Sequence, residues 1–199
     1  MLKTEPLLII FIIGILLSSC SKTGNPATTT PSDTTYLLNH SRFEQGGNPS
    51  LNGWTFNPAQ PDDTLDFEMD VPPGAGTWSF KLHTADLLDV HNSVSQSFTN
   101  LTSGVYSLTV WLKYKYILAP GTFPPGWISI IQTSGAVSAT KMQFGTDNTN
   151  WQPQTLLDTL VLLPTDTVTV LLSAGSRSVS SGLHGNPMWV DDISFGKLP

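Results

Sequence analysis

The chain has 199 residues with one cysteine, and nine Lys and Arg stand against 15 Asp and Glu, which gives a formal net charge of −6. This acidic balance disfavours nucleic acid and anionic lipid headgroups as partners, because both reward clusters of Lys and Arg. A single cysteine allows no disulfide within the chain. The length suits one domain that buries its core without cross-links.

The first 19 residues have the pattern of a secretory signal peptide. Lys3 supplies a charged start, and residues 7–17 are nearly all apolar, a run that is too short to span a bilayer. The segment ends in Leu17-Ser18-Ser19-Cys20, which resembles the bacterial lipobox. The resemblance implies an exported lipoprotein that begins at a lipidated Cys20 and is anchored to the cell envelope, with the outer membrane expected. An ordinary secretory signal with a chance cysteine is the alternative.

Residues 20–35 are expected to form a flexible tether. The polar sequence that follows Cys20 is rich in Thr and Pro and shows no apolar periodicity, and this composition is typical of a linker. Such a chain extends by roughly 3 Å per residue. It would therefore hold a folded domain, expected over residues 36–199, well away from the bilayer.

The rest of the chain is expected to fold as an all-β domain. Apolar residues do not repeat at helical spacing without a Pro or Gly in between, whereas apolar and polar residues alternate along several short segments. The clearest pair, 93–98 and 105–114, predicts two antiparallel strands joined by a turn, with Leu108, Val110 and Leu112 toward the core. Many short strands without intervening helices indicate a β-sandwich or jelly roll. Further strands are predicted at 77–83, 127–132, 139–144, 154–163, 167–173 and 188–195.

Several segments, taken in order, resemble one family of jelly rolls. The opening carries an F-E … G-W pattern at Phe43-Glu44 and Gly53-Trp54. The middle is similar to the pattern G-x-Y-S-x-x-L … Q-x-F … G-x-Y-x-L-x-x-W-x-K, with Trp78 where Tyr is usual. The last segment, which contains Asp191-Asp192, resembles a closing strand of alternating apolar residues around an Asp pair. The matching segments are 38–54, 76–82, 94–98, 103–113 and 188–195.

Together these segments resemble the galactose-binding-domain-like jelly rolls, in particular the carbohydrate-binding modules of families four, nine and twenty-two. They cover nearly the whole expected domain. The resemblance implies a β-sandwich jelly roll and the non-catalytic binding of a polysaccharide or other glycan. Because one fold carries many functions, a structural or adhesion module with an envelope protein as partner is the alternative, and a polysaccharide-active enzyme is a third.

The same resemblance implies a structural calcium ion between the opening segment and the last strand. Carried over residue by residue, its ligands are Glu44 and Asp191 or Asp192, with backbone carbonyls of the opening segment. Carboxylate and carbonyl oxygens suit Ca²⁺. The alternative is that these carboxylates are solvated strand-end charges or pair with Arg42 or a lysine.

Sugar binding needs flat aromatic faces, together with groups that hydrogen-bond to hydroxyls. Of the six tryptophans, Trp54 and Trp111 occupy positions where the resembled family buries an aromatic, so both are expected in the core. Other aromatics lie in or beside the Pro/Gly-rich stretch 119–126 and the polar stretch 147–152, and loops on a rigid sandwich often carry binding residues. The alternative is that these loop aromatics cover a hydrophobic edge of the sandwich and bind no sugar. The expected sugar-binding residues are Tyr114, Tyr116, Phe123, Trp127 and Trp151.

Asp66, Glu68 and Asp70 alternate along the chain, so on a strand their carboxylates would share one face. Two such groups could serve as the acid and the base or nucleophile of a glycosidase. The surrounding sequence lacks the E-x-D-x-x-E pattern of jelly-roll glucanases and the G-x-S-x-G elbow of hydrolases, so a solvated strand face is expected. His83 and His91 have no partners at metal-ligand spacing. No catalytic activity is therefore expected.

Overall fold

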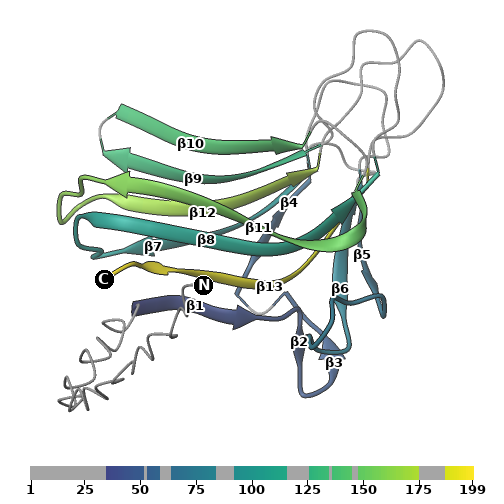
Figure 1. Ribbon diagram of the computed structural model, residues 1–199. Helices are drawn as coiled ribbons and strands as arrows, with labels where there is room; N and C mark the ends of the chain where they lie inside the picture. Colours follow the sequence, from purple (N-terminus) through teal and green to yellow (C-terminus); the bar gives the residue numbers. More distant parts are fainter. Residues whose placement is uncertain are drawn as a thin grey trace, which may run out of the picture. The chain divides into compact units, whose positions relative to one another are not determined.

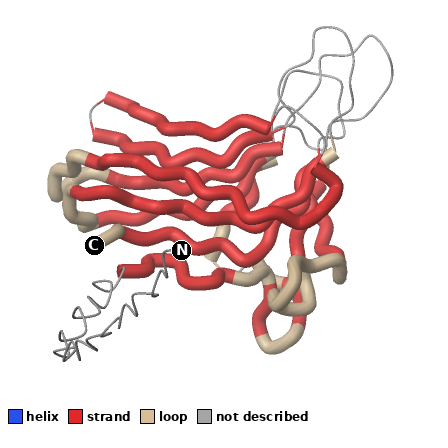
Figure 2. Tube along the Cα trace, viewed as in Figure 1, coloured by secondary structure: helices blue, strands red, loops and turns tan. Residues whose placement is uncertain are grey.

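A computed structural model describes eight stretches of the chain, all within the unit Pro31–Pro199, one of the two units into which the chain divides. These stretches contain strands and turns but no helix, and so none with the length and hydropathy to cross a membrane. The all-β prediction is confirmed. Figures 1 and 2 show the strands as two stacked sheets. The described residues are 35–51, 53–58, 64–83, 92–115, 126–134, 136–144, 148–174 and 187–199.

One sheet has six strands in the order β11-β8-β13-β6-β5, with β1 as a further partner of β13. All its pairings are antiparallel. The strand β13 has β8 along one side, while β6 and then β1 share its other side. The bounds are β1 (Thr35–Ser41), β5 (Thr64–Glu68), β6 (Ser79–His83), β8 (Gly104–Tyr114), β11 (Asn148–Leu160) and β13 (Met188–Lys197).

The second sheet has five strands in the order β10-β9-β12-β7-β4, again antiparallel throughout. A two-stranded ribbon of β2 and β3 lies between β1 and β4 in the chain. The bounds are β2 (Glu44–Gln45), β3 (Asn48–Pro49), β4 (Thr55–Asn57), β7 (Ser93–Thr99), β9 (Gly126–Ser134), β10 (Ala136–Phe144) and β12 (Thr167–Ala174).

The core lies between the two sheets. Alternation along β8 buries Leu108, Val110 and Leu112 completely, as predicted. Aromatic rings join the layers: Phe195 of β13 lies with its ring centroid 5.3 Å from that of Phe98 in β7. Burial of such side chains from both sheets is the main favourable contribution to folding, at about 1.5–3 kcal/mol for each large apolar side chain.

The predicted pairing of segments 93–98 and 105–114 is wrong. The strand β7 pairs with β12 and β4, whereas β8 pairs with β11 and β13 in the other sheet. The chain crosses between the sheets after Thr99, where Asn100 adopts a left-handed conformation (φ 59°). Both segments alternate because each turns one face to the shared core. Alternation therefore identified the buried faces and left the pairing partner undetermined.

The two ends of the sandwich are distinct in Figure 1. At one end Tyr114, the last residue of β8, packs across the sheets on Phe144, the last residue of β10, with ring centroids 5.0 Å apart. We call this the Tyr114 end. At the other end the first residue of β8, Gly104, pairs with Leu160, and the last residue of β13, Lys197, lies between β1 and β8. We call this the Gly104 end.

Candidate functional site

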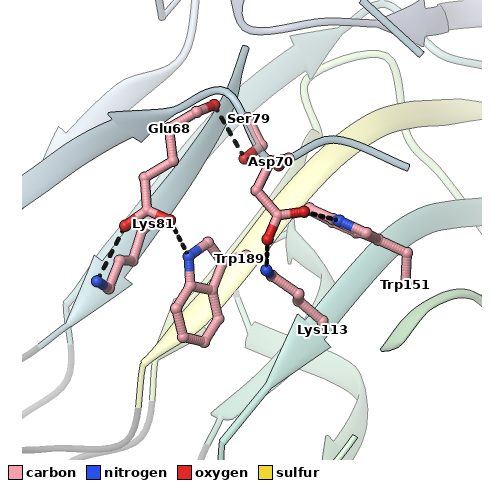
Figure 3. A network of polar contacts seen from close by, with 7 residues as sticks. All are labelled: Glu68, Asp70, Ser79, Lys81, Lys113, Trp151 and Trp189. Carbon is pink, nitrogen blue, oxygen red and sulfur yellow. Dashed lines mark hydrogen bonds and ion pairs between the residues drawn. The ribbon is translucent and has the colours of Figure 1, made fainter. Parts of the chain in front are cut away.

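A row of tryptophans and lysines crosses the outer face of the six-stranded sheet near the Tyr114 end, on the side away from the five-stranded sheet (Figure 3). In register, Trp189 of β13 lies opposite Lys113 of β8 on one side and Lys81 of β6 on the other. Trp151 of β11 lies beyond Lys113, and two carboxylates complete the group. We call these residues the tryptophan face: Glu68, Asp70, Lys81, Lys113, Trp151 and Trp189.

Strand periodicity places these side chains outward. In β13 the buried Met188 and Val190 flank Trp189, and in β8 the buried Leu112 and Tyr114 flank Lys113. Successive side chains of a strand point to opposite faces, so burial of the flanking residues directs Trp189 and Lys113 to the outer face. Both remain half-buried there, because their neighbours in adjacent strands cover part of each.

Each carboxylate of the tryptophan face joins one lysine to one indole. Glu68 accepts a hydrogen bond from Trp189 Nε1 at 2.7 Å and pairs with Lys81 Nζ at 3.0 Å. Asp70 accepts a hydrogen bond from Trp151 Nε1 at 2.8 Å and forms an ion pair with Lys113. The backbone that carries both carboxylates is fixed as well, since Ser79 Oγ donates to Asp70 O at 2.6 Å. The orientation of both indoles is therefore set by the network.

The lysines also lie over the tryptophan rings. Lys113 Nζ is 4.7 Å from the ring centroid of Trp189 and 5.5 Å from that of Trp151, so one ammonium group contacts both rings. Lys81 Nζ lies 5.0 Å from the Trp189 centroid. Cations at such distances are attracted to the electron-rich ring face. Charge, hydrogen bonds and ring contacts together hold the face in one arrangement.

Both carboxylates remain ionised at neutral pH. The hydrogen bond from Lys113 lowers the pKa of Asp70, and burial, which acts in the opposite direction, does not reverse this. Burial raises the pKa of Glu68, but the hydrogen bonds from Trp189 and Lys81 outweigh it, so the net pKa is lowered. A glycosidase needs one carboxyl group with a raised pKa as general acid. Glu68 and Asp70 do not supply such an acid.

The expectation of a solvated strand face is therefore correct only in part. Asp66 is exposed on β5, in register with Lys81. Glu68 shares that face through its pairing with Lys81, and Asp70, two residues beyond the strand, reaches the same network. Asp70 is exposed as expected, but its carboxylate, like that of the partly buried Glu68, is also bound by tryptophan and lysine side chains.

The structure separates the expected sugar-binding residues. Trp151 belongs to the tryptophan face, whereas Trp127 lies on β9 of the other sheet, where Lys141 Nζ is 4.7 Å from its ring centroid. Tyr114 is buried in the core against Phe144, so its ring offers no face to a ligand and its expected role is not supported. Three further expected functional residues lie outside the described residues: Cys20, Tyr116 and Phe123. His91, for which no role was expected, lies outside them as well.

Of the two tryptophans expected in the core, Trp54 and Trp111, the structure buries only the first. Trp54 is buried and its ring centroid lies 6.0 Å from that of Phe43, which confirms the expectation. Trp111 is half-buried on the outer face of β8, because it alternates with the buried Val110 and Leu112, so its expected core position is wrong. Sequence reasoning missed Trp189 as a candidate, although it lies between two apolar residues of a predicted strand.

The residues expected to bind calcium gather where β13 changes partner from β6 to β1. Asp191 is buried: its Oδ1 accepts a hydrogen bond from the Asp192 backbone N–H at 2.7 Å, and its Oδ2 has no partner among the described residues. The pKa of Asp191 is raised to about 7, and burial is the main cause; the charges of Asp192 and Glu44 also raise it, while the Asp192 hydrogen bond and the Arg42 charge lower it. A buried carboxylate oxygen without a partner suits a cation.

Glu44, the other expected ligand, is held by the backbone. Its Oε2 accepts a hydrogen bond from the Thr77 N–H at 2.7 Å, and its carboxylate lies so close to Gly76 that a Cβ there would be 2.2 Å from Oε1. Among the described residues no group of three or more His, Cys, Asp or Glu side chains is placed to hold a metal ion. Calcium also takes backbone carbonyls, so the ion stays a prediction.

No family model matches the sequence, and no curated protein matches it. Solved structures match it in fold. The enzymatically active domain of tailspike protein 4 from bacteriophage CBA120 has a TM-score of 0.58 and 14% identity, over 81% of this chain and 22% of its own. A CBM4 carbohydrate-binding module has a TM-score of 0.50 and 15% identity, over 80% of this chain and 99% of its own. The CBM22 tandem of Paenibacillus barcinonensis Xyn10C has a TM-score of 0.52 and 15% identity, over 85% of this chain and 47% of its own.

These likenesses define the class of fold. The chain is an all-β sandwich whose fold is similar to that of solved carbohydrate-binding modules, which confirms the expected β-sandwich jelly roll. It spans less than a quarter of the tailspike domain and about half of the tandem. At such low identity the likeness establishes the fold, and function has to be argued from the residues of the site.

Proposed function

We propose that the chain is a non-catalytic carbohydrate-binding module whose tryptophan face binds a polysaccharide. The observation that carries the proposal is the fixed pair of indoles: Trp151 and Trp189 each have their N–H bound to a carboxylate and share one ammonium neighbour. Flat aromatic surfaces pack on the apolar patches of sugar rings, and an already fixed side chain loses little conformational entropy on binding. The carboxylates and lysines beside the rings can bond to sugar hydroxyls.

The charges of the face favour an uncharged glycan. Lys81 and Lys113 are matched by Glu68 and Asp70, so neither lysine carries an unbalanced charge. Asp66, exposed on the neighbouring strand, adds negative charge, and the whole chain has a formal net charge of −6. Acidic polysaccharides would be repelled by this surface. Neutral chains meet no such cost.

We further propose that the domain is displayed from a lipid anchor at Cys20 through the polar tether. The lipobox-like end of the signal sequence supports this proposal, and the first described strand begins at Thr35, the last residue of the expected tether. A lipid-anchored binding module would keep captured polysaccharide at the envelope, where other envelope proteins could use it. The module would then concentrate polysaccharide at the envelope without converting it.

Affinity electrophoresis of the soluble fragment 21–199 tests the proposed function. Gels would contain uncharged plant, algal and fungal polysaccharides in one series and acidic polysaccharides in another, each at low and high salt. We expect retardation by at least one uncharged polysaccharide with little dependence on salt, because no net charge is screened. Retardation only by acidic chains, lost at high salt, would contradict the neutral ligand. No retardation by any polysaccharide would refute the function and favour a protein partner.

A further inference from the structure

Exposed apolar side chains gather at the Gly104 end of the six-stranded sheet, away from the tryptophan face. Val161 and Leu163, which follow β11, are 76% and 62% exposed. Leu157 of β11 and Val105 of β8 are exposed beside them. Val105 lies near the start of β8 and Lys113 of the tryptophan face near its end, so eight residues, or up to about 27 Å of strand, separate the two surfaces.

Hydrogen bonds hold this apolar segment in place. The Leu162 N–H donates to Ser103 Oγ at 2.8 Å, and the Leu163 N–H donates to Asp166 Oδ2 at 2.8 Å. The carbonyl of Val161 accepts a hydrogen bond from Gln132 Nε2 at 2.8 Å. Two apolar side chains are therefore presented to solvent from a fixed backbone. Several exposed apolar side chains at one end of a domain are typical of an interaction site.

The same end carries few charges. Among the described residues of 35–37, 99–106, 133–138, 157–167 and 195–199, the charged side chains are Asp158, Asp166 and Lys197. Asp166 is buried and accepts hydrogen bonds, and Lys197 Nζ donates to Thr102 Oγ1 at 3.0 Å. The remainder is apolar, Ser, Thr or Asn. Such a surface suits the apolar side of a lipid interface better than a charged partner.

The chain enters the domain at this end. A hollow there is lined by Thr35, the first described residue, together with Leu37, Leu101 and Thr102. A second hollow shares Leu101 and Thr102 and reaches Leu162. The apolar segment therefore adjoins the point where residues 21–34 lead back to Cys20. A bilayer that holds Cys20 would be connected to this end of the sandwich.

We infer that the Gly104 end rests on the bilayer, with Val161 and Leu163 inserted at the boundary between headgroups and acyl chains. The inference depends on the proposed lipid anchor. If residues 20–35 form the expected flexible tether, the anchor alone would not fix the orientation of the domain on the membrane. Apolar contact adds a preferred orientation. The tryptophan face, at the far end of β8, is then directed away from the membrane toward polysaccharide in solution.

The contact is apolar and not electrostatic, which makes it testable with uncharged membranes. The full-length lipidated protein would be reconstituted in vesicles of zwitterionic phospholipid and isolated by flotation. Leu163→Cys would carry a polarity-sensitive fluorophore, since the lipid on Cys20 leaves no other thiol to label. Asn57→Cys is the matched control: Asn57 is exposed on β4 and pairs with Ser93, at the Tyr114 end of the sandwich.

We expect the fluorophore at Leu163 to shift its emission to the blue and to be quenched by headgroup-labelled lipid, at low and high salt alike. The fluorophore at Asn57 should keep its emission in water and escape quenching. Val161→Ser, at an exposed position, should reduce the quenching at Leu163 without changing the melting temperature.

Three results would overturn the inference. If the protein floats but both fluorophores report water, the anchor exists without docking. If both are quenched, the domain lies on its side. If the protein does not float at all, the proposed lipid anchor is wrong and the docking inference that depends on it is wrong as well. The proposed glycan binding does not depend on that result.

Discussion

The buried carboxyl group of Asp191 is expected to make the stability of the domain fall as the pH rises. Asp191 is fully buried and its Oδ2 has no partner among the described residues. Its pKa is raised from 3.8 to about 7, mainly by burial. Asp191→Asn removes the charge but keeps an oxygen that can accept the hydrogen bond from the Asp192 N–H.

The sign and the magnitude follow from the two pKa values. The unfolded chain loses the Asp191 proton near pH 4 and the folded chain near pH 7, so in that interval the folded state binds more protons and the free energy of unfolding falls with rising pH. Each pKa unit corresponds to about 1.4 kcal/mol, so the whole penalty is about 4 kcal/mol above pH 7. Below about pH 4 both states are protonated and the penalty vanishes.

Thermal unfolding in EDTA measures the effect. At pH 8, Asp191→Asn should melt about 10 °C above the unsubstituted chain, given roughly 2–4 °C per kcal/mol for a domain of this size. At pH 4 the two should melt together. An equal difference at both pH values, or a less stable variant at pH 8, would refute the argument. If Ca²⁺ binds as expected, it stabilises the unsubstituted chain at pH 8 and leaves the variant unchanged; no shift in either chain would show the calcium prediction to be wrong.

Three further predictions concern other parts of the chain. Gly76→Ala should lower the melting temperature, because a Cβ would lie 2.2–2.8 Å from three atoms of the Glu44 carboxylate and would displace it from its hydrogen bond with the Thr77 N–H; an unchanged melting temperature would show that this hydrogen bond does not stabilise the domain. Lys113→Met should raise the pKa of Asp70 toward its ordinary value, because it removes the hydrogen bond that lowers the pKa; an NMR titration of the carboxyl carbon checks this, and a pKa that stays low would exclude Lys113 as the cause. Cys20→Ala should release the protein from membranes in a flotation assay, and continued flotation would refute the lipid anchor.

The sequence predicted which face of a strand is buried better than it predicted which strands pair with each other. Leu108, Val110 and Leu112 were identified as core residues because period-two alternation depends only on local burial. The partners of β8 are β11 and β13, which lie far along the chain, and no local pattern encodes that choice. The pairing of β7 with β8 was inferred from their closeness in sequence, and the crossing between sheets after Thr99 made it wrong.

The candidate site was partly predictable for the same reason. Trp151 was proposed as a binding residue and Asp66, Glu68 and Asp70 as a shared face, and both features lie near each other in the structure. Their meeting depends on the strand order β11-β8-β13-β6-β5, which brings five distant segments into one row. Alternation between Met188 and Val190 could have directed Trp189 outward. It could not have shown that Lys113 lies beside it.

The central claim, that the tryptophan face binds a neutral polysaccharide, is tested most directly by calorimetric titration of two tryptophan variants. Trp189→Ala removes one ring of the tryptophan face. Trp127→Ala is the matched control, because Trp127 is a half-buried ring on the outer side of the other sheet and also has a lysine, Lys141, over its ring. We expect Trp189→Ala to weaken binding by about tenfold or more, as loss of a central aromatic contact usually does, and Trp127→Ala to leave the affinity unchanged. Loss of binding with Trp127→Ala alone would contradict the account and move the site to the five-stranded sheet.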